Sequence, residues 1–397
     1  MTLSDLFNKN SILKRYYFKT LIVIGFFWTL FDYSRFLALS LIEEVDEYPF
    51  AEKSQSIFIL MFIIGLIAYS TMAYWLIFPL KTRLRKYPLW LNFVLKTLIL
   101  CLGTAVYAIL NFYIIYIFIY GKSPIAASSS LFHFAFQTSW LLSYVTSRLL
   151  LYLITLFALE INEKYSPGVF TDIFIGKYLD PKEEKRIIFF IDLKDSTPIA
   201  EKLGHKKYFF FIRDFIHHIS LALLEYDGLI YQYVGDEIVV SWLSNKSNKH
   251  KSLQCMIRAR RIIQKESDYY RREYGIVPEY RIGAHMGLVT VGEIGIVKKD
   301  LTMSGDAMNT TARIRTQSGE LNQKIVGSAD FVKNIGLKDF QMESLGFIDL
   351  KGKKEALELF AFFSIYPLLV LKMHQRRSQH LIYYNYQQLT LYLPLSL

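Results

Sequence analysis

The chain has 397 residues, a formal net charge of +11 and a mean hydropathy of +0.24, with 52% apolar residues. Such hydropathy is unusual for a soluble protein, so part of the chain is expected to lie in a lipid bilayer. The basic residues form no stripe interleaved with aromatic ones, which argues against nucleic acid as a partner, and two cysteines, Cys101 and Cys255, exclude a disulfide framework.

The apolar residues are concentrated before about Leu159, and this break in composition sets the predicted domain organisation. We expect a transmembrane domain over residues 1–160, a cytosolic linker over 161–185, a folded domain over 186–363 and a tail without an assigned role over 364–397.

Four apolar stretches are long enough to cross roughly 30 Å of hydrocarbon. They are Tyr17–Ile42, Ser56–Leu80, Leu89–Tyr120 and Leu131–Leu159. Basic residues precede the first stretch and follow the second, while the loop between them is acidic, so both ends of the bundle should face the cytosol. We therefore expect a multi-pass protein of the inner or plasma membrane, in contact with the lipid bilayer. The first stretch could instead be a signal peptide, but its length and charged residues favour an anchor.

Three ionisable residues, Asp32, Arg35 and Arg148, fall at membrane depth. Such residues mark either a ligand or coupling site or a structural ion pair, and the sequence leaves both interpretations open. The linker 161–185 carries apolar residues at helical spacing between Pro167 and Pro181. A short helix that transmits a signal and a passive spacer are both compatible with this pattern.

From Arg186 the pattern predicts a strand, helices over about Thr197–Leu224, a strand pair, a helix over about Lys251–Tyr274 and a second strand pair, Tyr280–Gly295. This order predicts an α+β domain with a ferredoxin-like βαββαβ core, whose antiparallel sheet is covered on one face by helices.

Two aspartates stand at strand ends that this order places side by side. Asp192 ends the first strand, and Asp236 lies in the Gly235-Asp236 turn of the first strand pair. Two carboxylates can share two Mg²⁺ ions, which activate an attacking oxygen and screen a triphosphate. Either aspartate alone is more often a cap or a turn residue, but the pair in this order points to phosphoryl or nucleotidyl transfer.

Five motifs in sequence order resemble those of the class III nucleotidyl cyclases, and the resemblance covers about Ile188–Phe363. They are FIDLKDST and YQYVGDE, similar to the family's two metal motifs; RIGAHMGLVTVGEIG, similar to its second hairpin; TMSGDAMNTTARI, similar to its transition-state segment; and LGFIDLKGK, similar to its phosphate-binding strand. The resemblance implies a cyclase that uses two Mg²⁺ or Mn²⁺ ions and works as a homodimer with shared active sites.

The resemblance also implies roles for single residues. Asp192 and Asp236 would bind both metals with the backbone carbonyl of Leu193, and Thr197 would lie near the phosphates. From the other subunit, Asn309 would orient the ribose, Arg313 would neutralise charge at the α-phosphate, and Lys351, less surely Lys353, would hold the terminal phosphates. Asn309 and Arg313 stand four residues apart, so one helical face would present both.

Purine choice depends on the family's two base-selecting positions, which hold Gln232 and Thr302. Thr at the second position occurs in a subset of adenylate-forming members. A glutamine amide suits adenine but can rotate to suit guanine. Neither guanine-selecting residue is present, so we expect ATP as the substrate and cyclic AMP as the product, with GTP as the alternative.

Three positions depart from the pattern: Asp195 and Ser196 replace the commoner Gly and Phe, and Leu288 replaces a phosphate-binding Arg of some members.

Three other functions compete with this interpretation. A diguanylate cyclase needs glycine where Val234 stands, a transporter predicts internal repeats that the sequence lacks, and a silent nucleotide-binding receptor remains an alternative because of the unusual Gln232.

Overall fold

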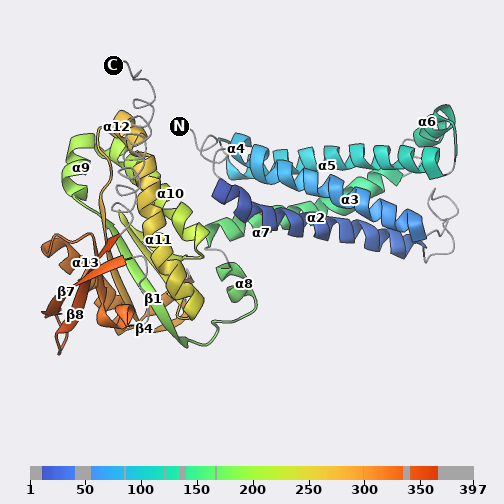
Figure 1. Cartoon of the computed structure of the whole chain (residues 1–397). Coiled ribbons are helices and arrows are strands. Elements are labelled where there is room, and N and C mark those ends of the chain that lie inside the picture. The colour runs from blue at the N-terminus through green and yellow to red at the C-terminus, as the bar shows by residue number, and fades with distance from the viewer. Residues whose placement is uncertain are drawn as a thin grey trace, which may run out of the picture. The chain divides into compact units, whose positions relative to one another are not determined.

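The structure is a computed structural model. It describes residues 11–40, 55–84, 86–119, 121–133, 140–165, 168–297, 299–333 and 340–364. The chain divides into two compact units, Met1–Tyr165 and Ser166–Leu397, each of which is described by itself (Figure 1). Apart from its first residue, the predicted tail over 364–397 lies outside the described residues.

The first unit is helical. Its elements are α2 (Ser11–Ser40), α3 (Gln55–Trp75), the π-helix η1 (Leu76–Leu80), α4 (Lys81–Leu84), α5 (Leu89–Ile114), the π-helix η2 (Ile115–Ile119), α6 (Pro124–Phe132) and α7 (Trp140–Lys164). Within the described residues, three segments are long and apolar enough to span a membrane: Ile59–Leu80, Leu89–Phe118 and Leu141–Lys164.

The expected first span is not among these three segments. It forms the helix α2 as predicted, but charged Lys19 and Asp32 lower its hydropathy. The predicted fourth span is also shorter at its start, since α6 ends at Phe132 and α7 begins at Trp140. The prediction of four spanning helices is therefore only approximate.

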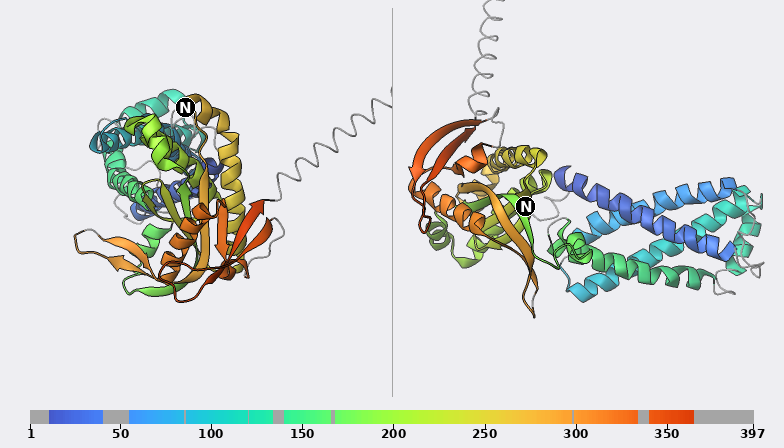
Figure 2. Two further views of the ribbon diagram at one scale, coloured as in Figure 1. Left: turned by 90° about the vertical axis from the view of Figure 1, so that its left-hand side faces the viewer. Right: turned by 90° about the horizontal axis from the view of Figure 1, so that it is seen from below.

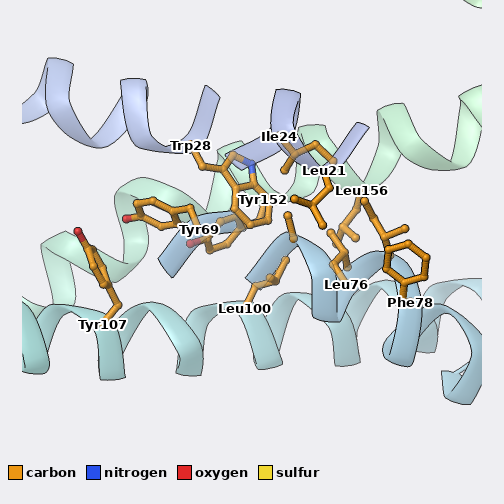
Figure 3. Close-up of a cluster of buried hydrophobic side chains, with 12 residues drawn as sticks. Leu21, Ile24, Trp28, Tyr69, Leu76, Phe78, Leu100, Tyr107, Tyr152 and Leu156 are labelled. Carbon is orange, nitrogen blue, oxygen red and sulfur yellow. The ribbon is translucent and has the colours of Figure 1, made fainter. Parts of the chain in front are cut away.

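An aromatic cluster lies between the helices of this unit (Figure 3). Trp28 of α2 is almost fully buried, its ring centroid lies 4.8 Å from that of Tyr152 on α7, and its Nε1 donates to Thr155 at 3.0 Å. Tyr69 of α3 meets the same indole edge to face at 6.2 Å. Three helices are thus joined by ring contacts of defined geometry.

The buried charges of this unit pair with one another. Arg148 on α7 forms a salt bridge with Asp32 on α2, and its Nε donates to the Tyr69 hydroxyl at 3.1 Å. The Tyr144 hydroxyl donates to Asp32 at 3.1 Å, and its ring lies 3.5 Å below the guanidinium. The structure thus agrees with the ion-pair interpretation of Asp32 and Arg148, while the Arg35 side chain lies outside the described part of the chain.

The second unit is built on one sheet. Its elements are α8 (Val169–Phe174), β1 (Lys182–Leu193), α9 (Ser196–Leu203), α10 (His205–Glu225), β2 (Leu229–Val234), β3 (Glu237–Leu243), α11 (Lys246–Lys265), α12 (Ser267–Tyr274), β4 (Tyr280–Ile294), β5 (Asp300–Ser304), α13 (Asp306–Glu320), β6 (Ile325–Ser328), α14 (Ala329–Val332), β7 (Phe340–Ile348) and β8 (Leu357–Ser364). The strand order is β2-β3-β1-β4-β6-β8-β7, with β5 paired to β4.

The predicted α+β class and its βαββαβ core are confirmed, with three corrections. The sheet is mixed, because β4 pairs parallel with β6. The predicted second strand pair Tyr280–Gly295 is one strand, β4, whose glycines at 283, 287 and 292 keep extended backbone, and the turn comes later, before β5. This hairpin of β4 and β5 extends from the sheet (Figure 2).

The third correction concerns the faces of the sheet, both of which are covered by helices. Every residue of β1 from Arg186 to Ile191 is buried, although neighbouring side chains on a strand point to opposite faces. One face packs under α10 and α11, where Phe215 meets Tyr280. On the other face, Ala307 and Met308 of α13 join a cluster with Ile188. Both faces of the central strand β1 are therefore shielded from water, as its unbroken run of apolar residues requires.

Candidate active site

Three carboxylates gather at the end of β1. Asp192, the penultimate residue of β1, is the direct partner of Glu237, the first residue of β3. Directly paired residues of an antiparallel ladder point to the same face, so these two side chains lie next to each other. Asp236 precedes Glu237 in a turn that Gly235 opens with φ of +62°. The structure thus brings Asp192 and Asp236 together.

Two described cations face this carboxylate cluster: Arg315 on α13 and Arg281 on β4, the cross-strand partner of Asp192. Arg315 on α13 places Nη2 2.7 Å from Oε2 of Glu237 and Nη1 3.5 Å from Oδ2 of Asp192. The helix reaches the sheet here because β4 has a glycine below it. A Cβ atom at Gly283 would lie 2.5 Å from the backbone nitrogen of Arg315. Sequence reasoning gave no role to Arg315 or Glu237; the signal was a second arginine two residues after Arg313, on another helix face.

The electrostatics of the cluster follow from burial and mutual repulsion. Burial raises the pKa of Asp192; Arg315 lowers it, and the nearby Asp236 raises it further. The pKa of Glu237 is raised by burial and by Asp192, against the opposing effect of Arg315. Burial is the main cause of both raised pKa values. The three carboxylates outnumber the two arginines that act on Asp192, Arg315 and Arg281, and a bound cation would offset the remaining negative charge.

The residues present fit a divalent cation. Oδ2 of Asp236 is buried without a hydrogen-bond partner among the described residues, as expected for an oxygen whose partner is an ion. Leu193, whose carbonyl was predicted to assist, is buried at the same strand end. No group of three or more His, Cys, Asp or Glu side chains in the described ranges could hold a metal unaided. Further ligands would come from backbone carbonyls, water or a bound phosphate.

The loop after β1 leads into the short helix α9, whose first turn carries the exposed Thr197. Asp195 has φ of +57°, a left-handed conformation that glycine adopts most easily and that aspartate tolerates. This conformation explains why the departure from the family's glycine leaves the turn intact. Lys194 lies 3.9 Å from Asp195, so a cation offsets part of the added negative charge.

A second set of predicted residues lies around α13 and the turn after Leu350. Asn309 is exposed and Arg313 half-buried on this helix. The Arg313 guanidinium meets the turn at Gly352, where an added Cβ would lie 3.2 Å from Nη2. This turn carries the exposed Lys351. The structure therefore places Arg313 beside the turn that presents Lys351.

Lys353, the second lysine of this turn, has a partner within its own chain. Its Nζ donates to Oδ2 of Asp306, the first residue of α13, and this hydrogen bond is the main cause of a lowered pKa for Asp306. The ion pair ties the turn to the start of the helix. Lys351 is therefore the freer of the two lysines to reach a ligand.

The two predicted base-selecting residues lie on β2 and β5, two strands that are not paired with each other. Gln232 is exposed on β2, and Thr302 is half-buried on β5. Their chain neighbours are in contact, since the backbone N–H of Met303 donates to the Tyr231 hydroxyl at 3.1 Å. Gln232 and Thr302 therefore belong to one local region of the chain. Leu288, the third departure, is 61% exposed on β4.

Comparison with known proteins identifies the domain that carries these residues. Residues 180–363 match the family model described as the adenylate and guanylate cyclase catalytic domain. Over 204 residues the chain is 30% identical to adenylate cyclase 2 of Rhizobium meliloti (strain 1021), covering 51% of this chain and 56% of that protein. It is 26% identical to the adenylate cyclase of Anabaena cylindrica, covering 51% and 42%. The chain thus spans about half the length of the curated relatives it matches.

Among solved structures, the adenylyl cyclase CyaB from P. aeruginosa aligns with 22% identity and a TM-score of 0.43, covering 47% of this chain and 96% of that one. A bacterial light-regulated adenylyl cyclase aligns with 21% identity and a TM-score of 0.45, covering 53% and 62%. The family match spans the carboxylate cluster, α13 and the Lys351 turn. Residues 180–363 therefore form a domain of the class III adenylate and guanylate cyclase family.

Proposed function

We propose that this protein is a membrane-bound adenylate cyclase that converts ATP to cyclic AMP and pyrophosphate. The observation that carries the proposal is the pairing of Asp192 with the turn that holds Asp236, whose buried Oδ2 has no hydrogen-bond partner among the described residues. Family membership supplies the reaction class, and the curated relatives it matches are named adenylate cyclases.

The geometry of α13 supports an active site shared between two chains. Helical residues two positions apart point in nearly opposite directions, about 200° around the axis. Arg315 faces Asp192 of its own chain, so Arg313 points away from that carboxylate, toward Gly352. Asn309, four residues before Arg313, shares its side of the helix. In one chain the carboxylates and the Asn309/Arg313 face therefore point in different directions. In a homodimer, each active site would combine the carboxylates of one chain with the Asn309/Arg313 face of the other.

Each residue has a defined task in the proposed reaction. Asn309 would orient the ribose so that its 3′-oxygen lies in line with the α-phosphorus, and Lys351 would hold the terminal phosphates. As the new P–O bond forms and the bond to pyrophosphate breaks, Arg313 would neutralise charge on the α-phosphate. Asp192 and Asp236, with the Leu193 carbonyl, would hold two Mg²⁺ or Mn²⁺ ions, which supply activation of the attacking oxygen and charge screening.

ATP is preferred over GTP because of the residues at the base-selecting positions. The Gln232 amide can donate to adenine N1 and accept from the adenine amino group, and Thr302 offers a hydroxyl nearby. The same amide can rotate for guanine, so discrimination rests on few hydrogen bonds. A guanylate cyclase with the same mechanism is the second candidate, since the matched family model covers both activities.

The helical unit would anchor the enzyme in the inner or plasma membrane with the cyclase domain in the cytoplasm, as the three apolar helices and the basic flanks favour. The part of the predicted linker that opens the second unit carries the helix α8, and Tyr178 just after it is buried in one cluster with Val291 and Met303 of the β4–β5 hairpin. This packing favours a linker that transmits a signal over a passive spacer.

Product analysis tests the proposal. Membranes that contain the full-length protein are incubated with ATP or GTP and Mg²⁺ or Mn²⁺, and the products are identified by mass spectrometry beside an Asp236→Ala control. We expect cyclic AMP from ATP, lost in the control. Cyclic GMP as the main product would overturn the purine choice. No cyclic product under any condition would favour the silent receptor.

A further inference from the structure

We propose that Arg315 is an internal counter-ion of the metal site, which holds Asp192 and Glu237 when no metal is bound and competes with the first divalent cation for Asp192. The inference rests on the proposed two-metal function. The observation behind it, the ion pairs of Arg315 with Asp192 and Glu237, is independent of that function. These ion pairs correspond to no role that the family resemblance implies.

The charge balance of the site requires such a cation. Asp192, Asp236 and Glu237 bring three carboxylates to one strand end, and the side chains of Asp192 and Glu237 are only 23% and 11% exposed. Like charges that share a partly buried site raise the free energy of the folded protein unless a cation offsets them. Among the described residues, Arg315, 30% exposed, forms ion pairs with two of the three, whereas Arg281 acts on Asp192 alone from the neighbouring strand.

The same position makes Arg315 a competitor of the metal. Its Nη1 lies 3.5 Å from Oδ2 of Asp192, an oxygen that a bound ion would need within about 2.0–2.6 Å. A guanidinium and a divalent ion at one carboxylate repel each other. Binding of the ion therefore weakens the contact with Asp192, and the tighter contact with Glu237, at 2.7 Å, can hold the displaced guanidinium.

The backbone limits how far Arg315 can move away. Gly283 lets α13 approach β4 so closely that a Cβ there would lie 2.5 Å from the Arg315 nitrogen and 2.7 Å from its Cα. The helix is thus fixed at this residue, and the adjustment falls on the side chain. Arg315 therefore sets how tightly the site binds its first metal ion.

Metal affinity measured without nucleotide tests this role. Full-length protein in detergent micelles is titrated with Mn²⁺, and free Mn²⁺ is read by electron paramagnetic resonance; thermal melting in EDTA and in Mn²⁺ is followed in parallel. We expect Arg315→Gln to bind Mn²⁺ about tenfold more tightly. It should also melt at a lower temperature in EDTA and gain more from Mn²⁺ than the wild type. Arg315→Lys, which keeps the charge, should stay near the wild type.

A matched control separates this role from the loss of any ion pair. Arg258 forms a 2.7 Å ion pair with Glu225 on another part of the domain. Its side chain is 35% exposed, a fraction similar to the 30% of Arg315. Arg258→Gln should melt lower in EDTA and in Mn²⁺ alike, with unchanged Mn²⁺ affinity. Equal Mn²⁺ affinity of the wild type and Arg315→Gln would overturn the inference alone. If the wild type shows no Mn²⁺ binding that the Asp236→Ala substitution removes, both the metal site and the inference are overturned.

Discussion

Two inactive variants should restore each other's activity if the active site is shared between chains. Asp236→Ala removes a proposed metal ligand, and Arg313→Ala removes the charge proposed to act at the α-phosphate; each alone should lose at least about 100-fold in activity. The two side chains point in different directions from one chain, because Arg313 meets Gly352 while Arg315, on nearly the opposite side of α13, meets the carboxylate cluster.

The size of the restored activity follows from counting sites. When both variants are produced in equal amounts in the same membranes, about half of the dimers contain one chain of each kind. Such a dimer has one site with both residues intact and one with neither, so total activity should be about a quarter of the wild type. Cyclic AMP formed per amount of protein in the membranes is the readout.

The double variant supplies the matched control. Mixed with the wild type in equal amounts, the chain that carries both substitutions should spoil both sites of a mixed dimer and leave about a quarter of the activity. A site contained within one chain would instead leave about half. No recovery from the two single variants, together with half activity in this control, would refute the shared site.

Three further predictions concern stability. Replacing Asp32 by Leu should destabilise the helical unit by about 3–5 kcal/mol because Arg148 is left buried without its counter-ion, whereas replacing both by Leu should recover most of the loss, as thermal melting in micelles would show. Burial lowers the pKa of both His218 and His285 to about 4, below the 6.5 of the unfolded chain, so the unfolded state binds more protons as pH falls. Each histidine should therefore lower the free energy of unfolding by about 2 kcal/mol between pH 7 and 5, with no effect above pH 7. In chemical denaturation, His218→Phe should lose less stability over this pH range than the wild type. Gly283→Ala should cost about 2–3 kcal/mol because the added methyl meets the backbone of α13; a melting temperature equal to the wild type would contradict that close approach.

The sequence predicted the fold where local patterns and order agree. The unbroken apolar run of β1 and the Gly235-Asp236 turn have local causes, and their order implied that Asp192 and Asp236 come together. The length of β4 was missed because glycines usually end a strand, whereas here Gly283 and Gly287 leave room for α13 and keep the strand extended.

The contacts of Arg315 were out of reach for a different reason. They depend on how closely α13 approaches the sheet, which is a property of tertiary packing and leaves no periodic signal in the sequence. Likewise, the pairing of Asp32 with Arg148 joins residues from α2 and α7, and the sequence offered a coupling site as an equal alternative. Long-range pairs between charged residues are therefore the part of the site that needed the structure.

The central place of β1 in the sheet has a consequence for biosynthesis. Its partners β3 and β4 come later in the chain, and β4 ends about 100 residues after β1, a length that a ribosome makes in about 5–20 s. During that time the uncharged run Ile187–Ile191 has no complete cover, and such a segment is prone to pair with other chains. Nascent chains and fragments that end before Glu320 should therefore depend on chaperones to stay soluble, because α13, which covers the other face of β1, is completed only there.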